Sequence, residues 1–543
     1  MIQKIIPVVI ALCLAHSSQA QYISSVTVPD STLTAVTDDE AAALASTITA
    51  ADLREYLTVL ASDEYEGRET GTLGNDKAAA FISKHFKELG LTPAGLENSY
   101  SQPVGFTFSG WEDTDIFIGE KRYKHLWDYI AFPNKNRSIP VIQSEEVIYL
   151  GYGIDDEKYS DYAKNDVNGK VIMINKGEPY KKDSTSWISG TREASKWTTD
   201  INTKLEAAHQ KGVKLVLIIE DNLQGMLADN RRNLVGYTTD MGEIVDEEMT
   251  TANHAYISTT LAKDIAAKKS KKIAKARTRS NKKGKACDVK LKAPFKMNMI
   301  KDVKTLKSKN IAGIIKGSEK PDEYIVVSAH YDHLGKRGEE IYNGADDNGS
   351  GTSTVMELAE AYARAKGKGL APKRSVIFLL VTGEEKGLLG SAYYAENPLR
   401  PLEQTMCNVN VDMVGRVDEK YADNPHYIYV IGSDRLSTDL HKINEEVNQK
   451  YTQLTLDYTY NDENDPNRYY FRSDHYNFAK NGIPAIFFFN GVHADYHRTT
   501  DTVDKINFEK MEQVGQHIFH LTWELANRDT KIKVDGKVQT TTR

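Results

Sequence analysis

One stretch constrains the fold of this 543-residue chain more than any other, because an apolar run leads directly into side chains that bind metals. Tyr324 to Ala329 is apolar and β-branched without alternation, which is typical of a strand covered on both faces of a parallel sheet. His330 follows at once, and Asp332 is spaced to accept a hydrogen bond from the far ring nitrogen of a metal-bound imidazole. Taken alone, the pair fits a surface histidine beside an aspartate equally well.

The next segment, Asn343 to Gly351, reads N-G-A-D-D-N-G-S-G. Its glycines permit unusual backbone angles, and the adjacent carboxylates of Asp346 and Asp347 repel each other unless a positive charge lies nearby. A metal ion would supply that charge. Residues 352–365 have the apolar spacing of a helix, so the acidic loop is predicted at a strand-to-helix junction.

Three later apolar runs also end in residues of the types that bind metals. Two sets of histidine and carboxylate ligands, with a carboxylate to bridge them, are what a two-metal hydrolytic site requires. The runs and the residues that follow them are Ser375–Val381 with Glu384 and Glu385, Val409–Val411 with Asp412, and Ile483–Phe489 with His493, Asp495 and His497.

Six motifs, in this order along the chain, resemble the family-28 metallopeptidases, which include bacterial di-zinc aminopeptidases and relatives of glutamate carboxypeptidase. They are H-Y-D-H-L-G, G-A-D-D-N-G-S-G, G-E-E-K-G-L-L-G-S, N-V-D-M-V-G, R-S-D-H-Y-N-F and D-Y-H-R-T-T-D-T. Together these motifs are highly specific. The resemblance implies two zinc ions per chain, with Asp346 bridging them, His330 and Asp412 on one ion, and Glu385 and His497 on the other.

The same resemblance implies catalytic roles for residues beside these ligands. Glu384 matches the general base, Asp332 matches the partner of His330, and Tyr496 would donate a hydrogen bond to the developing oxyanion. Neighbouring side chains on an extended backbone point to opposite sides, so Glu384 is expected to be free for proton transfer if Glu385 is a ligand.

Three other histidines compete with the assigned ligands. We expect His475 to pack against or orient its loop. His493 is the serious rival of His497, which has the neighbouring residues that the family pattern needs. The third competitor is His333.

The fold class that follows is α/β: a three-layer α/β/α zinc-peptidase domain with a mixed, mostly parallel sheet, interrupted by a smaller β-rich domain. The insertion resembles a protease-associated domain in position and only weakly in residues, and is expected to shape substrate access. The predicted divisions are a signal peptide (1–20), a flexible leader (21–50), the peptidase domain (51–119 and 298–527), the insertion (120–297) and a polar tail (528–543).

The N-terminus predicts export, to the periplasm or outside the cell. A short positive region, an apolar core from Ile5 to Ala15 and the cleavage signal Ser18-Gln19-Ala20 are typical of a signal peptide. The apolar run is too short to span a bilayer, and no other membrane segment is predicted. Only Cys287 and Cys407 follow the signal, which leaves at most a single disulfide.

Charge argues against nucleic acid as a partner. The formal net charge is −7, and the lysine-rich segment Lys263 to Lys292 lacks interleaved aromatic residues, so it is interpreted as a solvated surface. A glycine-punctuated segment from Glu66 to Gly74 is interpreted as a structural loop before a helix.

The predicted function is that of a zinc aminopeptidase that removes N-terminal residues from peptides. A carboxypeptidase or dipeptidase of the glutamate carboxypeptidase type is the main alternative, because Arg468, Arg472 and Arg498 could bind a substrate carboxylate. A glutaminyl-cyclase-like transferase and an inactive receptor-like homologue fit the full ligand set less well. No oligomeric state or preferred residue is predicted.

Overall fold

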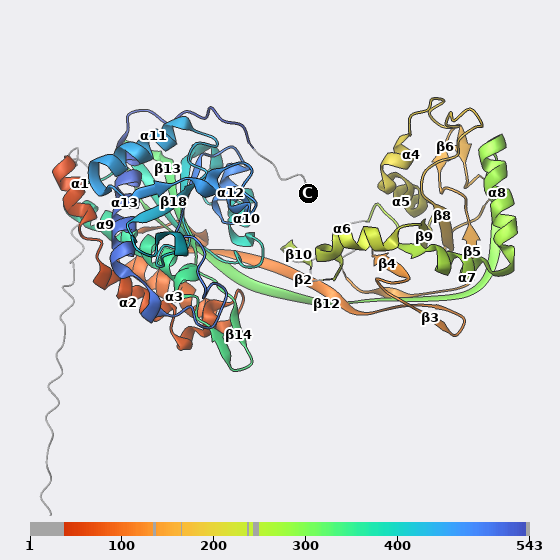
Figure 1. Ribbon diagram of the computed structural model, residues 1–543, viewed down its shortest axis with the longest axis horizontal. Helices are drawn as coiled ribbons and strands as arrows, with labels where there is room; N and C mark the ends of the chain where they lie inside the picture. Colours follow the sequence, from red (N-terminus) through yellow and green to blue (C-terminus); the bar gives the residue numbers. More distant parts are fainter. Residues whose placement is uncertain (1–36, 134–136, 164, 236–237, 243–248, 539–543) are drawn as a thin grey trace, which may run out of the picture.

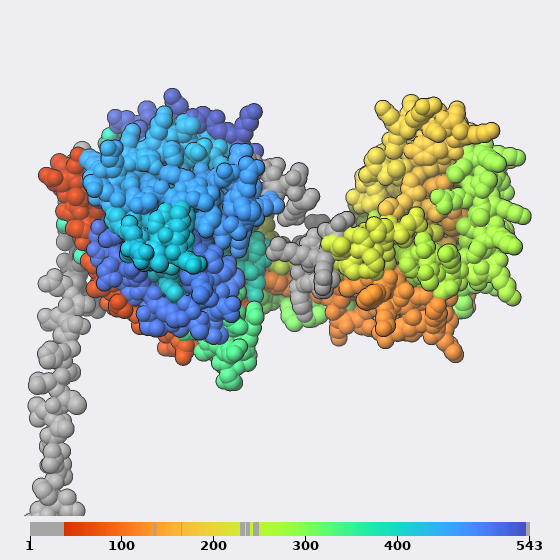
Figure 2. All heavy atoms as spheres, viewed as in Figure 1, coloured from red at the N-terminus to blue at the C-terminus, as the bar shows by residue number. Residues whose placement is uncertain are grey.

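The computed structural model describes residues 37–133, 137–163, 165–235, 238–242 and 249–538, which form two lobes. The main lobe comprises residues 37–110 and 302–538, and the inserted lobe comprises the described part of residues 111–301. A ribbon of two long antiparallel strands, β2 (Ser101–Ile118) and β12 (Val289–Ile315), runs between the lobes (Figure 1). Figure 2 shows the two lobes as separate bodies. The predicted signal peptide lies outside the described residues.

The main lobe is built on a mixed, mostly parallel sheet, as the sequence predicts. Strands β13, β16, β17 and β20 are parallel to one another, whereas β12 is antiparallel to β16 and β18 is antiparallel to β20. The order across the sheet is β19 (Thr455–Asp457), β18 (Tyr427–Ile431), β20 (Ala485–Phe489), β17 (Thr405–Val411), β13 (Lys320–His330), β16 (Arg374–Val381) and β12.

Helices cover both faces of this sheet and give the three predicted layers. Successive side chains of a strand point to opposite faces, so Val327 of β13 enters one core and Val326 enters the other. The first core includes residues of α1 (Asp38–Ala45), α2 (Ala50–Leu60), α3 (Leu73–Glu88), α9 (Gly351–Gly367), α11 (Thr438–Val447) and α13 (Phe508–Asn527). The second includes residues of α10 (Leu389–Glu396) and α12 (His475–Ala479).

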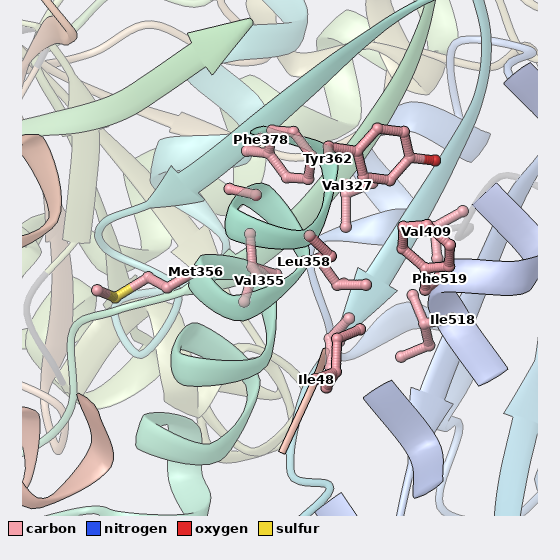
Figure 3. Close-up of a cluster of buried hydrophobic side chains, with 14 of the residues drawn as sticks. Ile48, Val327, Val355, Met356, Leu358, Tyr362, Phe378, Val409, Ile518 and Phe519 are labelled. Atoms are coloured by element: carbon pink, nitrogen blue, oxygen red, sulfur yellow. The ribbon is translucent and has the colours of Figure 1, made fainter. Parts of the chain in front are cut away.

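The first core brings α9 against the strands that precede the acidic and glutamate-rich segments. Figure 3 shows Val355 and Leu358 of this helix beside Val327 of β13, with Phe519 of α13 on the same side. Because α9 begins directly after the acidic loop, this packing fixes the position of the loop relative to the sheet.

The leader is ordered where the sequence predicted flexibility. Residues 21–36 lie outside the described residues, but α1 begins at Asp38 with a capping box between Thr37 and Glu40. Leu44 and Ile48 are buried in the first core. The prediction of a flexible leader is therefore wrong for residues 38–50, because apolar residues at helical spacing pack there against the main lobe.

The strands of the inserted lobe continue the same hydrogen-bonded sheet through β12, but this lobe has its own cores. Strands β5 (Ile139–Tyr149), β8 (Val171–Asn175), β9 (Leu215–Glu220) and β11 (His254–Ser258) are parallel, and β4 (Tyr129–Phe132) is antiparallel to β11. Strands β3 (Lys121–Lys124) and β10 (Thr238–Met241) each pair with β2. Its helices are α4 (Lys196–Thr199), α5 (Ile201–Gln210), α6 (Leu223–Val235), α7 (Thr259–Ala266) and α8 (Ser270–Lys283). The lobe therefore contains more helix than the predicted β-rich unit.

Three further expectations can be compared with the structure. Cys287 and Cys407 are both buried and free, so the disulfide left open by the sequence is not formed. In the predicted tail, Ile532 is buried against the first core. Within the described residues, no helix is long and apolar enough to cross a membrane.

Candidate metal centre

Four neighbouring parallel strands deliver the candidate ligands to one edge of the main sheet. Because β13, β16, β17 and β20 run in the same direction, the segments that follow them meet at their carboxyl ends. His330 is the last residue of β13, and Asp412 follows β17. Glu384 and Glu385 follow β16, and His497 lies in the segment after β20.

The first group consists of His330, Asp412 and Glu384. Nε2 of His330 lies 3.3 Å from Oδ1 of Asp412 and 4.0 Å from Oε2 of Glu384. One ligand-type atom from each of the three lies within 4.8 Å of the others, so the geometry alone would allow all three to hold one ion. The prediction that Glu384 is a base rather than a ligand stays a prediction.

The second group consists of His333, Asp347 and Glu385, with His497 beside it. Nδ1 of His333 lies 2.8 Å from Oε1 of Glu385 and 3.7 Å from Oδ2 of Asp347. Nε2 of His497 lies 3.0 Å from Oδ2 of Asp347 and 3.3 Å from Oε2 of Glu385. His333 was only a competitor in the sequence; its fully buried position beside Glu385 could not be read from a loop with no regular period.

Asp347, rather than Asp346, belongs to the second group and also reaches the first. Its Oδ1 is 3.5 Å from Nε2 of His330, and its Oδ2 faces His497 and His333. The assignment of Asp346 as the bridging residue is therefore corrected to Asp347. The only signal for it in the sequence was the pair of adjacent aspartates, because the periodicity of a strand or helix does not extend through this loop.

The carboxylate of Asp346 is engaged on the other side of the loop. Its Oδ1 accepts hydrogen bonds from the backbone N–H of Gly415, at 2.7 Å, and from the hydroxyl of Ser350, at 3.0 Å. Its Oδ2 is 3.1 Å from Nε2 of His493. His493, the rival of His497, thus pairs with Asp346 and belongs to neither group. The carboxylate of Asp501 accepts hydrogen bonds from the backbone N–H groups of Asp346 and Asp347, which holds the loop in this orientation.

Asp332 contacts His330 differently from the sequence expectation. Nδ1 of His330 lies 3.1 Å from the backbone carbonyl of Asp332, whereas the nearer carboxylate oxygen of Asp332 is 3.8 Å away. A carbonyl can only accept, so Nδ1 donates and Nε2 of a neutral His330 is left to bind a metal. The carboxylate of Asp332 instead accepts from the Thr70 hydroxyl at 2.8 Å and the Glu384 N–H at 3.2 Å.

Tyr496 stacks on His497, with ring centroids 3.9 Å apart, and lines the same pocket as both groups. Burial, together with Asp347 and Glu385, raises the pKa of Tyr496, so its hydroxyl keeps its proton. His475 is buried and stacks on Phe487 rather than joining either group.

The two adjacent glutamates have opposite electrostatic environments. Burial and the charge of Glu385 raise the pKa of Glu384 well above its usual value, although His330 opposes this. Burial also opposes ionisation of Glu385, but the neighbouring imidazoles of His333 and His497 hold its pKa well below its usual value. Burial lowers the pKa of His497, but the neighbouring carboxylates of Asp347 and Glu385 outweigh this effect and raise the pKa to about 10.

The donor atoms fit divalent metal ions. Buried nitrogen and oxygen atoms of His333, Glu385 and His497 have no hydrogen-bond partner in the protein, although they lie close together. Leaving such atoms unsatisfied costs about 1–3 kcal/mol each. Imidazole and carboxylate ligands without thiolate suit zinc among the transition metals. The residues present therefore fit a site in which a metal, rather than a hydrogen bond, satisfies these atoms.

The pocket above the ligands has an aromatic wall. Met413, Phe487, Phe489 and Val492 provide apolar surface. The other residues that line it are His330, Asp347, Glu384, Asp412, Tyr469, Arg472, Tyr496 and His497. An apolar side chain of a bound molecule can therefore be buried in this pocket within reach of both groups of candidate metal ligands.

Comparisons with known proteins find relatives that match part of this chain. Aminopeptidase YwaD of Bacillus subtilis is 29% identical over 238 residues, which cover 42% of this chain and 47% of that protein. A probable leucine aminopeptidase of Trichophyton verrucosum is 30% identical over 224 residues, which cover 40% and 57%. The chain thus spans about half the length of these curated relatives.

A solved aminopeptidase structure from Aneurinibacillus sp. strain AM-1 covers 92% of this chain and 98% of its own, with 19% identity and a TM-score of 0.44. Residues 310–522 match the family described as Peptidase family M28. This segment contains both groups of candidate ligands, from His330 to His497. Residues 310–522 of this protein are therefore similar to peptidase family M28.

Proposed function

We propose that this protein is an exported zinc aminopeptidase that holds two zinc ions and hydrolyses the N-terminal peptide bond of its substrates. The observation that carries the proposal is the pair of ligand groups on either side of Asp347, open to one aromatic pocket. The family M28 match and the relatives named aminopeptidases support the same reaction class.

The ligand assignment that we propose places His330 and Asp412 on one ion, Glu385 and His497 on the other, and Asp347 on both. Zinc ions, when bound, supply Lewis-acid polarisation of a carbonyl and lower the pKa of water. His333 is the alternative nitrogen ligand of the second group, because it lies within 2.8 Å of Glu385.

We propose that Glu384 is the residue that transfers the proton. Its side chain lines the pocket beside His330, Asp347 and Asp412, so it can reach a water between the substrate and the ligand groups. We propose that an oxygen of the Glu384 carboxylate takes a proton from this water and passes it to the nitrogen of the leaving peptide. The N–H of Glu384 is held by Asp332, which fixes the backbone from which the carboxylate extends.

Substrate orientation uses the pocket wall. The protonated hydroxyl of Tyr496 is available to donate to a carbonyl oxygen that becomes negatively charged during attack. Met413, Phe487 and Phe489 form an apolar surface, which suits a substrate with a large apolar N-terminal residue.

The test is a comparison of substrates that differ only at their ends. Purified protein should hydrolyse peptides with a free N-terminus from that end, should leave their N-acetyl counterparts intact, and should tolerate a C-terminal amide. Cleavage of N-acetylated peptides from the C-terminus would replace the proposal with a carboxypeptidase. Failure to cleave any peptide in the presence of zinc would refute both.

A carboxypeptidase of the glutamate carboxypeptidase type is the second candidate, because Arg472 lines the pocket and could pair with a substrate carboxylate. Among the described residues that line this pocket, Arg472 is the single arginine; Arg468 and Arg498 are not among them. Replacing Arg472 with Gln should therefore abolish binding of a C-terminal carboxylate if this candidate is correct. It should have little effect on a substrate that is amidated at the C-terminus.

Export and the role of the insertion complete the proposal. The predicted signal peptide in residues 1–20 supports export, and mass spectrometry of the N-terminus of protein recovered from cells would test it by showing a start at Gln21.

We infer that the inserted lobe is a protease-associated-like unit that shapes substrate access. Its apolar strands lead to neither ligand group.

A further inference from the structure

The segment before α3 supplies a buried arginine beneath the candidate metal centre. Arg68 is 1% exposed, and all of its hydrogen bonds go to backbone carbonyls. Nε donates to Tyr331 at 2.8 Å, and Nη2 donates to Gly344 at 2.9 Å. Nη1 donates at 2.7 Å to both Leu60 and Asn343. No carboxylate in the described part of the chain lies within ion-pair distance of this guanidinium.

Three of these four carbonyls belong to two segments that must be held at a defined separation, and the fourth, that of Leu60, lies at the end of α2. Tyr331 directly follows His330 at the end of β13, and Asn343 and Gly344 begin the loop that carries Asp347. The guanidinium is planar and its donors have fixed directions, so it sets the distance between the segments that it joins.

The residues beside Arg68 contact the same site. The Thr70 hydroxyl donates to Asp332 at 2.8 Å, and Asp332 also accepts from the N–H of Glu384. The carboxylate of Glu69 accepts from Nζ of Lys386 at 2.6 Å, directly after the two glutamates. Consecutive residues of this segment therefore reach the ends of β13 and β16 as well as the acidic loop.

The backbone of the segment adopts an unusual conformation at Gly67 and Arg68. Gly67 has φ +65°, and a Cβ there would lie 2.2 Å from the carbonyl oxygen of Tyr342. Arg68 itself has φ +54°, in the left-handed region that disfavours residues with a side chain. Such a conformation persists where the surrounding contacts demand it, and here those contacts are the carbonyls of the metal centre.

We propose that Arg68 is a positioning residue that holds His330 and Asp347 at the separation needed to bind a pair of divalent ions, and that Thr70 orients Asp332 for the same purpose. This inference rests on the proposed two-metal function. It assigns a specific role to a segment that the sequence had indicated only as a structural loop.

Two substitutions separate the positioning role from the positive charge. Arg68→Ala removes the charge and all of the hydrogen bonds that the guanidinium donates, whereas Arg68→Lys keeps the charge but loses the planar arrangement of donors. Both should weaken zinc binding and lower kcat by about 10–100-fold, the usual effect of removing a residue that supports a metal ligand, with KM changed less than about twofold. Free guanidinium ion should partly restore both quantities in Arg68→Ala and not in Arg68→Lys.

The experiment is a zinc titration of the full-length metal-free protein against a chromophoric chelator, with and without low concentrations of guanidinium, accompanied by kinetics. Arg374→Ala is the matched control. Arg374 is also 1% exposed, but it begins β16 at the end of the strand away from the site and bonds to Glu323. Arg374→Ala should lower stability and leave the zinc affinity of the folded protein unchanged.

The outcomes distinguish this inference from the proposed function. Wild-type protein that binds no divalent ion would refute the two-metal function itself. If wild type binds zinc and Arg68→Ala binds it within twofold, the positioning role is overturned. It is also overturned if guanidinium fails to restore zinc binding to Arg68→Ala, or if Arg374→Ala loses as much zinc affinity as Arg68→Ala does. Should Arg68→Ala not fold, Thr70→Val decides: a zinc affinity at least about fivefold weaker supports the inference, and an unchanged affinity overturns it.

Discussion

Replacing Asp347 with Asn should disrupt both metal sites at once. Asp347 faces His330 with one oxygen and His497 with the other, at 3.5 and 3.0 Å, so each group loses the same negative charge. A unit charge about 4 Å away in a medium of effective dielectric constant about 20 contributes about 4 kcal/mol, which is about a thousandfold in Kd. The asparagine oxygen remains a weak ligand, so we expect a loss of about 10²–10³-fold in zinc affinity for each ion.

Asp346→Asn is the matched control, because the same chemical change is made one residue away. Asp346 bonds to Gly415, Ser350 and His493 and not to the ligand groups. This variant should keep both ions and lose about 1–3 kcal/mol of unfolding free energy.

Metal analysis after dialysis against a buffer of fixed free zinc, combined with denaturant unfolding, measures both effects. The reasoning is refuted if Asp347→Asn keeps two ions while Asp346→Asn loses them.

Three further predictions concern the base, the insertion and a buried histidine. Glu384→Gln should retain zinc and lose about 10²–10⁴ in kcat, whereas Glu385→Gln should shed zinc; equal zinc loss in both would show that base and ligand are misassigned. Replacing residues 111–301 with a two-residue turn across the β2–β12 ladder should leave zinc content intact, and zinc loss in a folded deletion would contradict this. Burial, with a small effect of His520, lowers the pKa of His517 to about 3 in the folded state. Below the unfolded pKa of about 6.5 the unfolded chain therefore binds more protons, and the free energy of unfolding decreases as the pH is lowered. The decrease should be up to about 1.4 kcal/mol per pH unit for wild type relative to His517→Gln, measured by denaturant unfolding between about pH 5 and about pH 6.5, and equal slopes would exclude this contribution.

Local sequence patterns were sufficient for the elements that carry the site. The apolar runs before His330, Glu384 and Asp412 became neighbouring parallel strands, because a strand buried on both faces needs an unbroken apolar sequence. Parallel strands bring their carboxyl ends to one edge, so ligands separated by many residues in sequence could be expected together. The helix after the acidic loop followed from its apolar period in the same way.

The choice between adjacent residues was decided by tertiary contacts alone. Which of Asp346 and Asp347 faces the metal groups depends on Asp501, Gly415 and His493, which bind the loop from distant parts of the chain. No local period extends through such a loop, so its side-chain directions cannot be read from spacing. The order of α1 also depends on burial against the main lobe, because a short isolated helix is marginal in water.

The position of Arg68 is the clearest example of a feature that local sequence patterns do not predict. A charged residue in a polar, glycine-rich segment is normally solvent-exposed, and nothing in its sequence surroundings indicates burial. Its hydrogen-bond partners are backbone carbonyls, which every residue possesses and which therefore leave no trace in the sequence. The sequence determined which side chains could bind a metal, because that depends on residue type. Only the folded structure decided which of them face one another, because that depends on backbone contacts between distant segments.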